Sequence, residues 1–257
     1  MKIIYLSFLL ALTSLSVSAQ ELAKELQAPF QPGEHLHYKL NYGLFTAAEA
    51  DLRLEESPVK YDGKPAYHII ADGKTNGTFD FFFKVRNRYE SFMDCTTLLP
   101  YEYKENRREG KYRHTDDITF DRETNKITAT KGVFPFTGMV FDFPSAYYFA
   151  RCLDMTKIKV GDKLVFHYFL EDKIESLTIT FEGRESAECS LGTFECLKFS
   201  PSIIPGNIFR KDSKFYLWIT DDKNRIPVKA QVEVIVGSLT MDLTEAKGLK
   251  YPLNNKQ

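Results

Sequence analysis

The 257-residue sequence has little of several features that would point directly to a function. Its 34 Lys and Arg side chains nearly balance 35 Asp and Glu, so the formal charge is −1. This balance gives no electrostatic footprint for a nucleic acid or an anionic membrane. Four cysteines are too few for a disulfide scaffold. Beyond the N-terminal segment, no stretch reaches the ~18 apolar residues of a transmembrane helix.

Sequence motifs that carry chemistry are also missing. The chain has no G-x-S-x-G nucleophile motif, no glycine-rich phosphate loop and no C-x-x-C pair. His35 and His37 share one strand face, a spacing that zinc or copper could use, but no third ligand is marked and we interpret them as solvated. Adjacent acids at 116–117 and 221–222 would point to opposite strand faces. We therefore predict no catalytic residue, no metal and no cofactor.

The first 19 residues, MKIIYLSFLLALTSLSVSA, form a predicted signal peptide. Lys2 supplies its positive end, residues 3–12 its apolar stretch, and Val17-Ser18-Ala19 a small-residue cleavage site. No cysteine follows the apolar stretch, which argues against a lipid anchor. We expect cleavage after Ala19 and an exported, periplasmic mature chain of residues 20–257.

Export permits disulfides, and four cysteines allow three pairings. Cys189 and Cys196 flank an expected turn, and a symmetric hairpin centred on Gly192-Thr193 would place them opposite each other. A Cys189–Cys196 bridge is then feasible by distance. The alternative is that both are small hydrophobic residues on neighbouring strands.

Most of the chain alternates apolar and polar residues, as in 36–42, 48–55, 177–182 and 239–244. This period of two is typical of antiparallel strands with one dry and one wet face. We expect roughly 14 strands between residues 35 and 130 and between 160 and 247. Open sheets seldom exceed ~10 strands. The prediction is therefore an all-β fold: a strongly curved sheet, a closed or half-closed barrel, or two packed sheets.

Two segments break the alternation. Residues 142–153 predict one short helix, because Asp142 can cap it and Pro144 suits its first turn. Residues 78–85, TFDFFFKV, could form another, with Thr78 as its cap. We expect one β-rich domain over residues 20–257, with pseudo-halves 30–130 and 155–247 as the alternative division.

Several short motifs together resemble the exported bacterial family called domain of unknown function 3108. They are FQPGEHLHYKLNYG at 30–43, RYES at 88–91, LPY at 99–101, EG at 109–110, PSAYYFAR at 144–151, GRE at 183–185, LGTF at 191–194, WITDD at 218–222, RIP at 225–227 and VGS at 236–238. The resemblance covers about residues 30–247, although Ala47-Ala48 stands where Ala-Gly would be typical. It implies an exported, β-rich protein without an agreed activity, and it brings no catalytic residue to this chain.

The sequence is rich in aromatic residues, with 21 Phe and 14 Tyr. Phenylalanines outside the alternation, at 79–83 and 134–143, could line or cover an apolar cavity inside a curved sheet. The candidate ligand-binding set is Phe79, Phe82, Phe83, Phe134, Phe136 and Phe141. The alternative is that these rings are ordinary core residues. Our leading hypothesis is non-enzymatic binding of a hydrophobic small molecule or lipid-like envelope component.

Two other functions remain open. The first is an interaction module that joins an envelope protein through a strand edge or the Tyr-rich hairpin 99–114. A basic cluster in that hairpin could contact anionic glycans or lipid headgroups, or be a solvated face; it comprises Lys104, Arg107, Arg108, Lys111, Arg113 and His114. The second is a hydrolase of envelope glycan or ester that uses dispersed Asp, Glu or His residues. Nucleic acid is not an expected partner.

Overall fold

The alternating segments form 15 strands in the computed structural model, which describes residues 27–202, 213–234 and 237–254. The strands are β1 (Glu34–Tyr42), β2 (Phe45–Glu56), β3 (Ala66–Thr75), β4 (Arg86–Asp94), β5 (Pro100–Glu109), β6 (Tyr112–Asp121), β7 (Lys126–Ala129), β8 (Gly132–Pro135), β9 (Val140–Phe141), β10 (Lys163–Leu170), β11 (Lys173–Cys189), β12 (Gly192–Pro201), β13 (Phe215–Thr220), β14 (Pro227–Glu233) and β15 (Ser238–Lys247). The helices are α2 (Gly77–Phe82) and α3 (Phe143–Arg151). The all-β prediction is confirmed.

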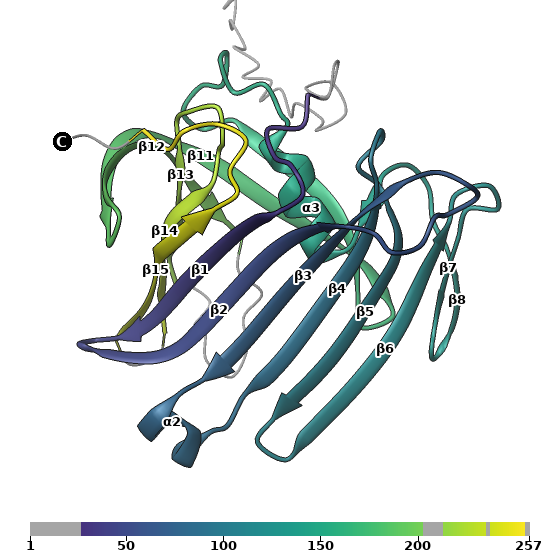
Figure 1. Cartoon of the computed structure of the whole chain (residues 1–257), viewed down its shortest axis with the longest axis horizontal. Coiled ribbons are helices and arrows are strands. Elements are labelled where there is room, and N and C mark those ends of the chain that lie inside the picture. The colour runs from purple at the N-terminus through teal and green to yellow at the C-terminus, as the bar shows by residue number, and fades with distance from the viewer. Residues whose placement is uncertain (1–26, 203–212, 235–236, 255–257) are drawn as a thin grey trace, which may run out of the picture.

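All of these strands belong to one strongly curved sheet (Figure 1). Its order is β8-β7-β6-β5-β4-β3-β2-β1-β15-β14-β13-β12-β11-β10-β9, so each strand pairs with its neighbour in sequence except where β1 meets β15. Every pairing is antiparallel apart from β9 with β10, which are parallel. The sheet ends at β8 and β9 and is not closed. Of the three predicted architectures, the curved, half-closed sheet is therefore the one found.

The longer of the two described helices, α3, lies against the concave side of the sheet, where it contacts β3, β4 and β10 (Figure 1). The Asp142 carboxylate accepts the backbone N–H of Ser145 at 2.7 Å, and the Ser145 hydroxyl returns to the Asp142 N–H at 3.1 Å. This reciprocal cap explains why the helix begins after Asp142. Tyr148, Phe149 and Leu153 are fully buried against β2–β4 and β9–β12. The short helix predicted near 142–153 is confirmed.

Side chains, not backbone hydrogen bonds, bring the two edges of the sheet together. Val140 and Phe169, on β9 and β10, pack against the concave side chains of β5–β7 in a second apolar cluster. At the end of the same seam, Lys131 forms an ion pair with Asp172 at 2.6 Å, and Arg107 with Glu171 at 3.6 Å. These contacts make the open sheet similar in shape to a barrel.

The β11–β12 hairpin turns earlier than the sequence predicted. Cys189 pairs with Gly192 across the two-residue turn 190–191, so Cys196 lies opposite Glu185. The predicted centre at Gly192-Thr193 is wrong, because Gly192 already begins β12. Cys189 and Cys196 are both free thiols, and the geometric reason for a bridge between them is lost.

Candidate functional site

The six phenylalanines proposed to bind a ligand separate into two groups. Phe136 and Phe141 are buried in the apolar clusters, and Phe134 packs on Phe169 with ring centroids 5.2 Å apart. The remaining three are Phe79, Phe82 and Phe83, in and just after α2. The six rings therefore do not line one common site, and the first group matches the alternative interpretation as core.

Exposed apolar side chains gather at the end of the sheet that carries α2. Eight of the twelve exposed large hydrophobic residues in the described part of the chain lie there, and we call these eight the apolar rim: Leu44, Phe45, Phe81, Phe82, Phe83, Tyr112, Leu170 and Ile174. They come from turns that an antiparallel meander returns to one end, and Figure 1 shows the β1–β2 turn, α2 and the β5–β6 turn along its lower edge. Several exposed apolar side chains at one end of a molecule mark a candidate interaction site.

Polar contacts hold α2 in place, although none of its residues is buried. The Asp80 carboxylate receives two guanidinium N–H groups of Arg86, at 2.9 and 2.5 Å, and the Thr75 hydroxyl at 2.5 Å. These hydrogen bonds, first from Arg86 and then from Thr75, lower the pKa of Asp80 to about 2. The N-cap position is occupied by Asn76, not by the predicted Thr78. The loop thus presents its phenylalanines on a fixed support.

Above the rim, the concave face of β4–β6 carries a group of polar side chains. We call it the concave polar cluster: Asn87, Tyr89, Tyr103, Glu105, Arg107, Glu109, His114 and Asp116. Strand register places these residues on one face, since Tyr89 pairs with Glu105, Glu105 with Asp116 and Arg107 with His114. The same face further along the strands packs against α3 and β9–β10.

Within the cluster, guanidinium, imidazole and carboxylate groups are paired. Arg107 donates two hydrogen bonds to Glu109, both at 3.2 Å, and the Asn87 amide donates to the same carboxylate at 2.7 Å. His114 contacts Glu105 at 2.9 Å. The Glu105 side chain is only 7% exposed, so these charges lie in a partly dry environment. The cluster therefore places cationic and anionic groups side by side on the concave face.

Six basic residues of the 99–114 hairpin were predicted to form one cluster. In the structure they do not share one face of the sheet. Arg107 and His114 pair across the strands on the concave side, whereas Lys104 and Arg108 lie on the outer side. Strict alternation along β5 was the signal that could have separated them. The concave polar cluster itself was missed, because its members come from three strands.

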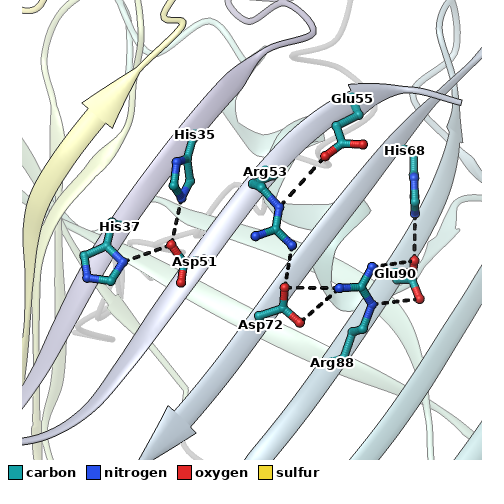
Figure 2. Close-up of polar contacts among 9 residues, drawn as sticks. All are labelled: His35, His37, Asp51, Arg53, Glu55, His68, Asp72, Arg88 and Glu90. Carbon is teal, nitrogen blue, oxygen red and sulfur yellow. Dashed lines mark hydrogen bonds and ion pairs between the residues drawn. The ribbon is translucent and has the colours of Figure 1, made fainter.

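The outer face of β1–β4 carries a second polar network (Figure 2). His35 Nε2 and His37 Nδ1 both contact Asp51 Oδ1, at 2.7 and 2.9 Å. Partial burial raises the pKa of Asp51, but hydrogen bonds from the two imidazoles outweigh it and lower the pKa overall. The two histidines that could have suited a metal by spacing are thus hydrogen-bonded to a carboxylate on the neighbouring strand.

The network continues across the next two strands by alternating charge. Arg53 pairs with Asp72 at 2.5 Å, and Arg88 bridges Asp72 and Glu90 at 3.3 and 3.1 Å. His68 closes the row by contacting Glu90 at 3.0 Å (Figure 2). Beside it runs an open groove of about 450 Å³ that includes Lys74, Arg86 and Arg108 among its lining residues. Cross-strand ion pairs of this kind stabilise a solvated sheet face modestly.

The contacts between histidines and carboxylates lie on both faces of the sheet. His35–Asp51 and His68–Glu90 lie on the outer face, and His114–Glu105 lies on the concave face. In each of these contacts the acid lies on an adjacent strand, so the pairing is not visible in the sequence. In the described part of the chain, no group of three or more His, Cys, Asp or Glu side chains is arranged to hold a metal ion. Also within the described residues, no helix is long and apolar enough to cross a membrane.

Comparison with known proteins supports the fold but names no activity. The family described as "Protein of unknown function (DUF3108)" matches residues 37–244. A beta-barrel-like protein of the domain of unknown function DUF1849 from Brucella abortus is 8% identical, with a TM-score of 0.54 over 86% of this chain and 98% of that one. The hypothetical protein CT021 from Chlamydia trachomatis is 9% identical, with a TM-score of 0.39 over 88% and 94%. No curated protein matches significantly.

Proposed function

Because the chain belongs to the protein family of unknown function DUF3108, we propose its function from its geometry: it binds a lipid-like amphiphile of the cell envelope. The binding site in this proposal is the α2 end of the curved sheet. Export to the periplasm is part of the proposal, and the predicted signal peptide, residues 1–19, lies outside the described residues. No enzymatic step is included.

One observation carries the proposal, namely the concentration of exposed apolar side chains at one end of the sheet. Leu44 is 99% exposed, Phe81 88% and Phe82 76%. Burying a Leu or Phe side chain contributes roughly 1.5–3 kcal/mol. A ligand or surface that covers the apolar rim would therefore gain considerable free energy.

The concave polar cluster adds charged side chains to the proposed apolar site. It places Arg107, Glu105 and Glu109 on the concave face, behind the rim. A phosphate could accept hydrogen bonds from Arg107, and an ammonium could donate to the carboxylates. We therefore propose a zwitterionic headgroup in the cluster, with the acyl chain along the rim phenylalanines.

Native mass spectrometry with lysophosphatidylethanolamine, kept monomeric, tests this proposal. The mature chain should form a one-to-one complex. Arg107→Gln should weaken it about tenfold or more, since a charge-assisted hydrogen bond contributes ~1.5–3 kcal/mol. Arg108→Gln is the matched control, because Arg108 is the next residue of the same strand and belongs to the outer face. Failure of the wild-type chain to bind the lipid, or equal binding by both variants, would refute the proposal.

A further inference from the structure

We propose that the apolar rim docks on the surface of a lipid bilayer that carries anionic headgroups. This inference deepens the proposed function and rests on the same rim, because it names the surface where the amphiphile would be met. Two groups of observations carry it: the placement of the apolar side chains on separate turns, and the charges between them.

The most exposed residues of the apolar rim lie on the tips of two different turns. Leu44 and Phe45 belong to the β1–β2 turn and the start of β2, and Phe81 and Phe82 belong to α2, between β3 and β4. Tyr112, 48% exposed, adds a third point at the β5–β6 turn. Separate tips at one end of a sheet can enter a bilayer interface together, whereas a peptide partner would need a continuous groove or strand edge.

The charges at this end are unequally paired, although the chain as a whole carries only −1. Three of the carboxylates at this end form ion pairs: Asp80 with Arg86, Glu109 with Arg107, and Asp172 with Lys131. The exposed cations Lys84, Lys111 and Arg113 lie beside the rim residues of α2 and the β5–β6 turn. The part of the rim at α2 and the β5–β6 turn is therefore locally basic, although the net charge of the whole chain does not show it.

The contacts of Arg113 show how these cations are presented. Its guanidinium donates to the backbone carbonyls of Gly110 and Tyr112, at 2.8 and 2.7 Å, so its charge is not neutralised by those partners. Exposed Lys and Arg side chains next to inserted aromatic residues are the usual complement of anionic lipid headgroups. The exposed cations and the apolar rim side chains thus both favour the same binding partner, an anionic bilayer.

Vesicle flotation tests how much the apolar rim side chains contribute to membrane binding. The mature chain should float with vesicles of phosphatidylcholine mixed with phosphatidylglycerol. The double variant Phe81→Ser/Phe82→Ser should lower the partition coefficient at least roughly tenfold, as expected from the loss of two buried aromatic side chains. Phe143→Ser/Val160→Ser is the matched control, because both residues are 70% exposed but lie toward the α3 end of the molecule. That control should bind like the wild type.

A second pair of variants tests the charge contribution. Lys84→Gln/Lys111→Gln/Arg113→Gln should lose most of the preference for phosphatidylglycerol over pure phosphatidylcholine vesicles. Lys60→Gln/Lys64→Gln/Lys157→Gln makes the same change of net charge at exposed positions toward the opposite end and should keep the preference. Circular dichroism confirms that each variant is folded.

The outcomes separate this inference from the proposed function. If the wild-type chain binds vesicles but not monomeric lysophosphatidylethanolamine, docking stands and the proposed function fails. If it binds the monomeric lipid but floats with neither vesicle, docking is overturned. Equal flotation of the rim variant and its α3-end control would also overturn it, because the rim would then not be the docking surface.

Discussion

Arg151, the last residue of α3, donates from both terminal guanidinium nitrogens to the carboxylate of Glu34, the first residue of β1, at 2.5 and 2.8 Å. Their side chains are 1% and 0% exposed. Arg151 Nε also donates to the backbone carbonyl of Asn224 at 3.1 Å, and the Tyr148 hydroxyl donates to Glu34 at 3.0 Å. A buried ion pair with these additional hydrogen bonds fixes the helix to the central strands of the sheet.

Removing one partner of this pair should be strongly destabilising. Arg151→Met leaves the buried Glu34 carboxylate uncompensated, and we expect it to lower the free energy of unfolding by about 3–5 kcal/mol. Urea denaturation near neutral pH measures the change. Arg184→Met is the control, because it breaks the more exposed pair with Asp221 at 2.9 Å and should cost about 0–1 kcal/mol. A loss for Arg151→Met as small as the control's would contradict the structural role.

The sequence predicts what depends on local pattern. Alternation identifies strands because successive side chains point to opposite faces, and Asp142 with Pro144 identifies the start of α3 because caps lie within one turn. The Glu34–Arg151 pair joins residues 117 positions apart, and no local pattern marks it. The same holds for the β1–β15 pairing, which places the first and the last described strands side by side at the centre of the sheet.

The candidate site was predictable only in part for the same reason. Phe79, Phe82 and Phe83 are spaced as an apolar helical face, which predicts burial, but α2 has no buried residue. Whether another element covers a helix is a tertiary property. The sequence predicts His35 and His37 to be solvated, because their partner Asp51 comes from the neighbouring strand. These contacts depend on which residues the strand pairing places opposite each other, and the amino-acid composition does not show this.

Asp142 should make stability depend on pH in a specific direction. Burial raises its pKa to about 6, although hydrogen bonds from Ser145 and Ser91 partly oppose this. An acid with a raised folded-state pKa contributes stability that is complete below its unfolded pKa, near 4, and is lost as the pH rises through 6. For a fully buried group the loss amounts to about 3 kcal/mol.

Asp142→Asn isolates this effect, because an amide stays neutral and can still accept the Ser145 N–H. The unfolding free energy of the variant relative to wild type should rise by about 3 kcal/mol between pH 3 and pH 7. Urea denaturation at several pH values gives the difference, in which most other titrating groups cancel. A difference that does not change with pH would show that Asp142 titrates normally.

Gly110, in the β5–β6 turn, supports the position of Phe83 on the rim. Its φ of +57° is left-handed, and a Cβ there would lie 3.1 Å from the Phe83 ring. We expect Gly110→Ala to cost about 1 kcal/mol from backbone strain and to displace the ring, which is 56% exposed and free to shift. Chemical denaturation measures the first effect, and the aromatic NMR signals of Phe83 report the second.

Gly63→Ala is the matched control for that variant. Gly63 also has a positive φ, +76°, but an added Cβ would meet open space. The two variants should lose similar stability, and only Gly110→Ala should move the Phe83 signals. A much larger loss for Gly110→Ala would show instead that Phe83 is held firmly against the turn.

The cysteines should remain reduced in the folded protein. Cys189 and Cys196 pair with Gly192 and Glu185 respectively, so neither faces the other across the hairpin. Burial raises the pKa of the Cys196 thiol to about 12, and that of Cys152 also to about 12, so little thiolate is available for oxidation. Unfolded, unreduced protein should therefore show four reactive thiols with a thiol reagent, the same number as after treatment with dithiothreitol. Folded protein should react slowly at Cys152 and Cys196, and a bridged peptide containing Cys189 and Cys196 would contradict the register of β11 and β12.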